Sequence, residues 1–402
     1  MKTTPLRACL LLFAVALGAE STPDPIRTVL PHDCEPAPKI HEAEGFKADG
    51  AIRPIFYDAL PYQGKPTRVF AWLGLPAKRE GKVPGMVLVH GGGGTAFKEW
   101  VRKWNEQGFA AISIAVEGQT DVNTNPQKGR QTWARHPFSG PARDGTFADT
   151  KLPLKEQWMY HALADTMLAN SLLRSLQEVD ASKIGVMGIS WGGVITSTVI
   201  GLDARFAFAI PTYGCGHLFD AENHWGRALH DNEGYKRVWD GMNYADRVKM
   251  PVLWLSWPQD THFPLGCQAE HYRKTPGPRT VSLITKMGHS HNAGWNPPDS
   301  YAFAKSVVET GKPWGTSPSA KTDSGTAVAV FHSTKPLTRA VLISTTDKGF
   351  TGTRKWVETP AMAASGGGGT TVSAPLPSGT TAWYFNAYAG DLTLTSDYQE
   401  VR

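Results

Sequence analysis

The most constraining feature of this sequence is a serine that stands between a strand-like run and a helix-like run. Residues 183–188 are apolar enough for a buried strand, and residues 192–201 have helical spacing. The five residues 188–192 read GISWG, with Ser190 at the centre. A G-x-S-x-G sequence in that context is typical of a strained strand-to-helix turn that exposes the serine side chain. The glycines make room for the tight backbone, and the helix N-terminus favours negative charge beside Ser190.

The serine turn lies within a long alternation of expected strands and helices. A Gly-Pro turn separates residues 53–59 from 67–75 and predicts an antiparallel hairpin. Short apolar runs predict buried strands at 84–90, 109–116, 183–188, 206–213, 251–257 and 280–286. Helical spacing recurs at 95–107, 155–178, 192–201, 268–274 and 301–310. This order predicts an α/β domain over residues 51–312, with a mostly parallel sheet covered on both faces.

The remaining segments differ from this domain in composition and in hydrophobic pattern. A charged start and a short apolar run predict a signal peptide over residues 1–19, and residues 20–50 read as an extended, surface-wrapping lead-in. Residues 313–323 are rich in Pro, Ser and Thr and predict a linker. Short β-like runs after it predict a small antiparallel β-sandwich over 324–402. Because domain boundaries fall in such linkers, we expect the catalytic part to remain active without the sandwich.

Composition excludes several classes of protein. The 402-residue chain has 41 Lys and Arg against 36 Asp and Glu, a net charge of +5, which is too weak an excess to predict nucleic acid as the main ligand. The only long apolar segment is the signal-like one, so we expect no stable membrane insertion. Beyond it, Cys34, Cys215 and Cys267 allow at most one intramolecular disulfide, and the apolar run before Cys215 favours a buried thiol there.

A second motif follows the expected strand 84–90. His90 is succeeded by four glycines, which let backbone N–H groups approach a negatively charged oxygen without Cβ obstruction. We expect the N–H of Trp191, together with that of Gly92 or Gly93, to form such an oxyanion hole. A dinucleotide site is the alternative for a glycine-rich turn, but the spacing fits it poorly.

A serine nucleophile needs a base, and the base needs an orienting acid. Asp260 follows the expected strand 251–257, and His289 follows 280–286, so both should emerge at the sheet edge that carries Ser190. We predict Asp260 as the acid and His289 as the base. His291 is the main alternative base and His262 a weaker one. A metal site at His289 and His291 is disfavoured because no Cys or acidic residue clusters nearby in the sequence.

With these residues placed, residues 51–312 resemble the α/β-hydrolase fold. More narrowly, the chain resembles secreted bacterial proteins of the acetylxylan esterase, dienelactone hydrolase and prolyl oligopeptidase-like families. The stretches that carry the resemblance are 89–96, 158–162, 188–193, 213–216 and 288–291. The resemblance implies Ser190 as the nucleophile, Asp260 as the acid and His289 as the base.

These observations predict a secreted or periplasmic serine carboxylic-ester hydrolase that works through an acyl-enzyme and needs no metal or organic cofactor. Trp133, Trp158 and Trp225 should rim the pocket, since indole faces stack well on sugar rings. We therefore expect a small acyl group on an oligo- or polysaccharide, or a small ester, as the substrate. A secreted serine peptidase and a non-catalytic carbohydrate-binding protein remain the alternatives.

Overall fold

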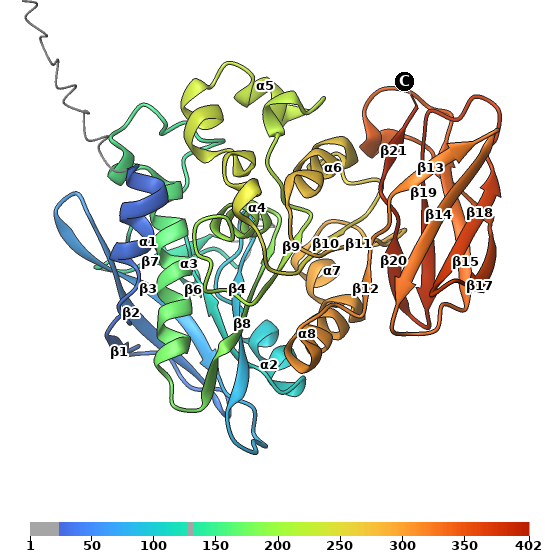
Figure 1. Ribbon diagram of the computed structural model, residues 1–402. Helices are drawn as coiled ribbons and strands as arrows, with labels where there is room; N and C mark the ends of the chain where they lie inside the picture. The colour runs from blue at the N-terminus through green and yellow to red at the C-terminus, as the bar shows by residue number, and fades with distance from the viewer. Residues whose placement is uncertain (1–23, 127–131, 402) are drawn as a thin grey trace, which may run out of the picture.

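The computed structural model describes residues 24–126 and 132–401, so the expected signal peptide lies outside the described residues (Figure 1). The centre of the molecule is a nine-stranded sheet with the order β1-β2-β3-β5-β4-β8-β9-β10-β11. Its antiparallel part consists of β1 (Ile40–Glu42), β2 (Ile52–Tyr62) and β3 (Lys65–Gly74). Its parallel part consists of β4 (Val83–Val89), β5 (Ala110–Ile114), β8 (Val179–Ile189), β9 (Phe208–Thr212), β10 (Val252–Ser256) and β11 (Arg279–Leu283). The predicted hairpin and the predicted α/β class are confirmed.

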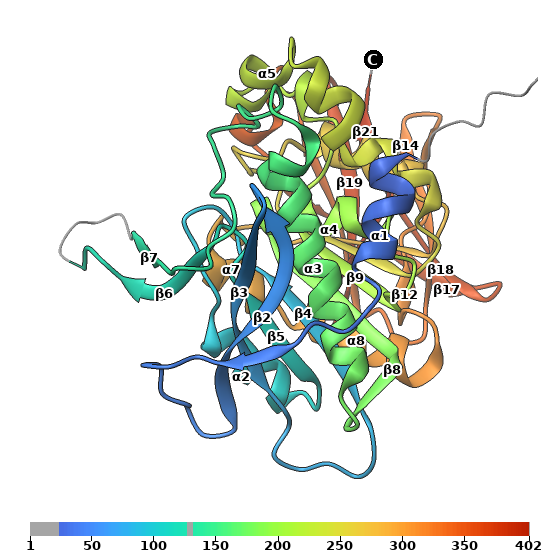
Figure 2. The ribbon, with the colours of Figure 1, turned by 90° about the vertical axis from the view of Figure 1, so that its left-hand side faces the viewer.

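Helices cover both faces of this sheet (Figures 1 and 2). Helices α2 (Lys98–Glu106) and α8 (Pro298–Thr310) lie on one face, where the rings of Trp104 and Tyr301 pack 4.8 Å apart. Helices α3 (Trp158–Ser175) and α4 (Trp191–Val199) lie on the other, followed by α6 (Leu265–Lys274). Because both faces are covered, the central strands are buried along their length and read as continuous apolar runs in the sequence.

The lead-in differs from the extended chain that we expected. Between residues 24 and 50 it forms the short helix α1 (Leu30–Asp33) and strand β1. The side chains of Ile26, Leu30 and Cys34 recur every four residues and are all buried in the main core. That spacing puts them on one helical face, which gives this segment an apolar side to bury.

The C-terminal residues form the predicted β-sandwich. One sheet contains β12 (Gly315–Thr316), β13 (Ala320–Asp323), β14 (Thr326–Ser333), β17 (Met362–Gly366) and β18 (Gly369–Pro375). The other contains β15 (Arg339–Thr345), β16 (Val357–Pro360), β19 (Ala382–Ala389), β20 (Leu392–Thr395) and β21 (Gln399–Glu400). The expected linker 313–323 thus contributes β12 and β13 to the sandwich, because backbone pairing with β14 orders this Pro- and Ser-rich stretch.

The sandwich covers the open edge of the nine-stranded sheet, beside β11 (Figure 1). The Leu283 N–H donates to Thr395 Oγ1 at 2.9 Å, and Asn386 Nδ2 donates to the Leu283 carbonyl at 2.9 Å. Nearer the start of β11, the Ser317 N–H donates to the Arg279 carbonyl at 2.8 Å. An edge strand with unpaired backbone groups invites aggregation, and here two side chains and one backbone N–H of the C-terminal part pair those groups instead.

The two parts also share apolar packing. Val341, Ile343, Tyr384 and Tyr398 of the sandwich belong to the same buried cluster as the core of the α/β part. A second cluster, centred on Trp314, Phe331, Leu342, Trp383 and Phe385, fills the sandwich itself. The composition break at residue 313 therefore does not separate two independently packed bodies.

Removal of the sandwich should consequently unfold the α/β part. We expect a protein ending at Thr316 to be insoluble or to melt without a cooperative transition, because the edge of β11 and part of the shared core become exposed. In the full chain, Asn386→Ala leaves the buried Leu283 carbonyl unpaired and should lower the free energy of unfolding by about 1–3 kcal/mol. Urea titration followed by circular dichroism measures both effects.

The exposed Thr322→Ala in β13 is the matched control, with an expected change within about 0.5 kcal/mol. The sandwich would be dispensable if a protein ending at Thr316 were soluble and active and if Asn386→Ala left the free energy of unfolding unchanged.

Candidate active site

Ser190 occupies a strained turn between β8 and α4. Its backbone has φ 58° and ψ −116°, a left-handed conformation that favours glycine. The Ser190 N–H donates to the Thr212 carbonyl at 3.0 Å, which ties the turn to the end of β9. A Cβ on Gly188 would collide with the Gly192 carbonyl, and one on Gly192 would collide with the Val89 carbonyl. The glycines on both sides of the serine are thus required by backbone contacts.

The glycine-rich loop after β4 lies directly against this turn. A Cβ on Gly91 would lie 3.0 Å from the Ser190 Cβ, and one on Gly92 would lie 2.7 Å from Cδ1 of the Trp191 ring. The structure therefore brings together the two sequence motifs that carry Ser190 and the glycine run. Gly93 adopts a positive φ of 73°, a further reason for glycine at that position.

Three N–H groups of the predicted oxyanion hole are without partners in the described part of the chain. Trp191 is the first residue of α4, so its N–H has no carbonyl one turn earlier in the helix. The N–H groups of Gly92 and Gly93 likewise donate no hydrogen bond to any described residue. These groups from two adjoining loops are the ones that the sequence predicted.

Asp260 and His289 meet at the ends of β10 and β11. The Asp260 Oδ2 lies 2.8 Å from the His289 Nδ1 and also accepts from the Trp257 indole N–H at 3.2 Å. Its Oδ1 accepts from the backbone N–H groups of His262 and Phe263 at 2.8 and 2.9 Å. The Asp260 side chain is only 1% exposed, so these four bonds replace its contact with water. Since a carboxylate only accepts, Nδ1 of His289 carries the proton and Nε2 keeps its lone pair.

The His289 ring is held between aromatic neighbours. Tyr213 packs on it with ring centroids 4.3 Å apart, and Phe263 stacks nearly parallel at 6.1 Å. Tyr213 follows Thr212, whose carbonyl binds the Ser190 N–H. The Tyr213 hydroxyl donates to the Ser290 carbonyl at 2.5 Å, which fixes the loop just after His289. One short segment at the end of β9, residues 212–213, therefore positions both Ser190 and the His289 ring.

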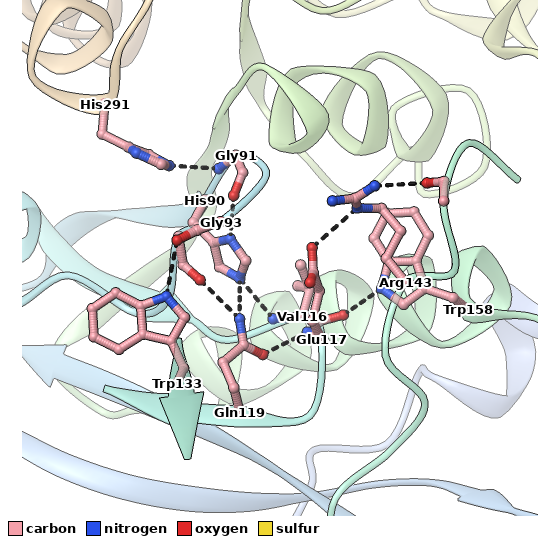
Figure 3. A network of polar contacts seen from close by, with 12 residues as sticks. His90, Gly91, Gly93, Val116, Glu117, Gln119, Trp133, Arg143, Trp158 and His291 are labelled. Atoms are coloured by element: carbon pink, nitrogen blue, oxygen red, sulfur yellow. Dashed lines mark hydrogen bonds and ion pairs between the residues drawn. The ribbon is translucent and has the colours of Figure 1, made fainter. Parts of the chain in front are cut away.

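The two alternative histidines have other partners. His291 Nε2 accepts the Gly91 N–H at 2.9 Å, so its lone pair is already engaged (Figure 3). Burial, followed by repulsion from His90 and His289, lowers the pKa of His291 to about 4. The His262 ring lies 4.7 Å from His289, and burial lowers the pKa of His262 as well. Neither histidine has a side-chain bond to Asp260.

The three predicted substrate-binding tryptophans differ in their surroundings. Trp158 is 2% exposed and donates its indole N–H to the Val116 carbonyl at 2.7 Å, while Trp225 is 6% exposed. Neither presents an open face for a sugar, contrary to our expectation, because both pack edge-on against Trp191. Trp133, in β7 (Trp133–Arg135) of the small hairpin with β6 (Gln119–Asn123), is partly exposed and donates to the Gly93 carbonyl at 2.9 Å.

The Trp191 ring is the centre of a tight cluster. Phe147, Trp158 and Trp225 surround it with centroid distances of 5.4, 5.7 and 5.0 Å. The Arg143 guanidinium lies 4.8 Å from the ring centroid and pairs with Glu117 at 3.2 Å. Sequence analysis missed Arg143 and Phe147, because their segment shows no periodicity. The only signal was the length of the polar stretch 117–154, which in a compact domain suggests function.

Other predicted features can be placed in the described residues as well. Cys34, Cys215 and Cys267 are buried free thiols there. Within residues 24–126 and 132–401 no group of three or more His, Cys, Asp or Glu side chains is arranged to hold a metal ion. Among the helices of the same ranges, none combines the length and the apolar character needed to cross a membrane.

Residues 54–222, less than half of the chain, match the family described as acetyl xylan esterase (AXE1). The chain is an α/β-hydrolase that resembles the acetyl xylan esterases. The match confirms the predicted resemblance and the predicted class of enzyme, a carboxylic ester hydrolase.

Solved structures of several hydrolases are similar to the chain. The acetyl xylan esterase from Paenibacillus sp. R4 is 24% identical, with 65% of this chain and 86% of that chain covered and a TM-score of 0.49. The acetyl xylan esterase 1 from Thermoanaerobacterium sp. JW/SL YS485 is 20% identical, with 65% and 87% covered and a TM-score of 0.49. The Pyrococcus horikoshii acylaminoacyl peptidase is 17% identical, with 64% and 42% covered and a TM-score of 0.48. Likenesses of this size do not separate an esterase from a peptidase.

The strain at Ser190 leads to a stability prediction. Ser190→Gly should be more stable than Ser190→Ala by about 1 kcal/mol, because glycine adopts a positive φ without cost whereas alanine stays strained. Both variants should lack ester hydrolysis. Ser197→Gly, in the regular part of α4, is the control. Its free energy of unfolding should fall by about 1 kcal/mol, because glycine is unfavourable inside a helix. Urea unfolding of the three variants tests this prediction. A Ser190→Gly protein less stable than Ser190→Ala would contradict the inferred backbone strain at Ser190.

Proposed function

We propose that this protein is a serine carboxylic-ester hydrolase in which Ser190 is the nucleophile, His289 the general base and Asp260 the orienting acid. The observation that carries the proposal is the 2.8 Å hydrogen bond between Asp260 and His289, together with a serine held at a positive φ in the strand-to-helix turn. The bond leaves His289 Nε2 as the acceptor for the hydroxyl proton. The segment 212–213, which contacts both Ser190 and His289, supports a common position for them.

The reaction begins with attack of the Ser190 Oγ on the ester carbonyl carbon. The hydroxyl proton passes to His289 Nε2, and the carbonyl π electrons move onto the oxygen. Asp260 stabilises the imidazolium that results and does not itself become protonated. The N–H of Trp191 and that of Gly92 or Gly93 receive the oxyanion, and one such donor typically contributes roughly 3–4 kcal/mol of barrier lowering.

Collapse of the tetrahedral intermediate breaks the bond to the alcohol oxygen. His289 returns its proton to that oxygen, the alcohol leaves, and the acyl group remains on Ser190. A water molecule then attacks the acyl-serine with His289 again as the base, releasing the carboxylic acid and restoring the serine. Each proton and electron pair is handled by protein side chains and water, so the proposed cycle calls for no metal or organic cofactor.

We propose a small acyl group on a carbohydrate as the substrate. The match of residues 54–222 to the acetyl xylan esterase family supports an acetyl ester. The close packing of Phe147 and Trp225 around Trp191, the residue after the nucleophile, supports a narrow acyl site. Trp133 is the partly exposed indole beside the glycine loop and can still line the alcohol side. The signal-like residues 1–19 support export to the periplasm or the medium.

The triad can be tested by single substitutions. Ser190→Ala and His289→Ala should each lower kcat on p-nitrophenyl acetate by several orders of magnitude, because nucleophile and base act as a unit. Asp260→Asn should also be impaired, since it allows the wrong tautomer of His289. The measurement is initial rates with circular dichroism as a check on folding, and an organophosphate should label wild type once, on Ser190.

Wild-type turnover by Ser190→Ala would refute the triad. The assignment of the base would also be refuted if His289→Ala stayed active while His291→Gln, which keeps a hydrogen-bond acceptor, lost all activity. A non-catalytic binding protein would show no organophosphate label and no turnover by wild type.

The substrate class calls for a panel of esters. We expect the highest kcat/KM on acetylated xylo-oligosaccharides or other acetyl esters and a decline from butyryl to octanoyl, because the cluster around Trp191 restricts acyl length. Released acid is measured for each ester, and released amine for a prolyl peptide amide. Higher efficiency on octanoyl esters or on the peptide amide than on every acetylated substrate would replace the proposal by a lipase-like or a peptidase activity.

A further inference from the structure

The peptide groups of Gly91 are bonded on both sides by histidines. The Gly91 N–H donates to His291 Nε2 at 2.9 Å, and the Gly91 carbonyl lies 2.7 Å from His90 Nδ1 (Figure 3). The same carbonyl accepts the Gly94 N–H at 3.0 Å, which closes the turn of the loop. Gly91 is thus fixed in position next to Ser190 by two side chains from opposite directions.

The bonding partners determine the tautomer of each histidine. His90 Nε2 accepts the Val116 N–H at 3.1 Å, so it carries no proton and His90 Nδ1 donates to Gly91. His291 Nε2 accepts the Gly91 N–H, so the proton of the neutral His291 ring is on Nδ1. Burial lowers the pKa of His90 to about 4, and both rings are neutral at pH 7.

Two other carbonyls of the loop are bonded as well. Gln119 Nε2 donates to the Gly94 carbonyl at 3.0 Å and to His90 Nε2 at 3.0 Å. The Trp133 indole N–H donates to the Gly93 carbonyl at 2.9 Å. Figure 3 shows that these donors reach the loop from the side of the β6–β7 hairpin, whereas His291 reaches it from α7 (His291–Trp295). Three carbonyls of the loop, those of Gly91, Gly93 and Gly94, are therefore hydrogen-bonded, whereas the N–H groups of Gly92 and Gly93 donate to no described residue.

We propose that His291 is a positioning residue that fixes the oxyanion-binding N–H groups of the glycine loop by accepting the Gly91 N–H. This inference rests on the proposed serine ester hydrolase function. It assigns the second histidine of the 288–291 segment a role that is distinct from that of His289. The loop has four consecutive glycines and little intrinsic stiffness, so the bonds from His291, His90, Gln119 and Trp133 set its shape.

The surroundings of His291 suit an acceptor that stays in place. Its ring packs on Phe97 with centroids 4.8 Å apart and lies 6.3 Å from the Trp295 ring. The titratable groups whose charge would bear on its pKa are His90 and His289. A protonated His291 would have no lone pair on Nε2 and could no longer accept the Gly91 N–H. The neutral ring therefore matches its neighbours as well as its partner.

Three substitutions of His291 separate hydrogen bonding from packing. Leu fills much of the ring's space without an acceptor, and Asn carries an acceptor that reaches only about as far as Nδ1. Gln places its Oε1 near the position of Nε2 and can accept the Gly91 N–H. Asn292→Ala changes an exposed neighbour in the same helix and is the matched control.

We expect His291→Leu and His291→Asn to lower kcat on p-nitrophenyl acetate roughly 10- to 100-fold, less than complete loss of one oxyanion donor. KM should stay within about twofold, because the bond acts in the transition state. The inhibition constant of a trifluoromethyl ketone, whose serine adduct carries an oxyanion, should rise by the same factor as kcat/KM falls. His291→Gln should recover most of the activity, and Asn292→Ala should equal wild type.

Active sites are counted with an organophosphate, so that a loss of folded protein is not read as a loss of kcat. Wild-type kcat in His291→Leu, a change in KM alone, or a Gln variant as impaired as Leu would overturn the positioning role. If His291→Leu does not fold, the comparison of His291→Asn with His291→Gln decides. Failure of the proposed function itself looks different, because wild type would then lack turnover or Ser190→Ala would keep it.

Discussion

The contact between the Ser190 turn and the end of β4 is the constraint on which the rest of the site depends. Gly192, at the start of α4, faces the carbonyls of Val89 and His90 so closely that no side chain fits. This contact locks the end of β8 to the beginning of the glycine loop. The place at which the glycine loop leaves β4, next to Ser190, follows from it. Backbone contact thus sets where the loop begins relative to the proposed nucleophile, and the side-chain bonds to Gly91, Gly93 and Gly94 then shape the loop.

A second constraint acts from the far side of the molecule. β11 leads into the His289 loop, and its outer edge is bonded by Asn386 and Thr395 of the sandwich. The Asp260 loop touches the sandwich as well, since a Cβ on Gly352 would collide with the Asp260 carbonyl. Both loops that carry the acid–base pair are therefore supported by residues more than sixty positions later in the chain. The role of the sandwich that the structure supports directly is to hold the β11 edge and the Asp260 loop in place.

The sequence was sufficient for features that are local or that follow from the geometry of parallel sheets. The Ser190 turn was predicted because strand, glycines and helix adjoin in the chain, and Asp260 and His289 because parallel strands end at one edge. The burial of Trp158 and Trp225 was not predictable, since the direction of a side chain in a helix start or loop depends on its tertiary neighbours. The pattern could not separate His289 from His291, which follow the same strand two residues apart. Their partners, Asp260 and Gly91, differ only in three dimensions.

Trp191 joins two properties of the site that are often treated as independent. Its backbone N–H is a proposed oxyanion donor, while its ring packs against Phe147, Trp158 and Trp225 and receives Arg143 on its face. The ring also lies so close to Gly92 that a Cβ there would be 2.7 Å from Cδ1. A change that enlarges the acyl site by replacing this ring would therefore release the glycine loop on the same side. In the proposed mechanism, acyl specificity and oxyanion stabilisation are coupled through Trp191, so a wider acyl site would require a new support for Gly92 as well as a smaller residue at position 191.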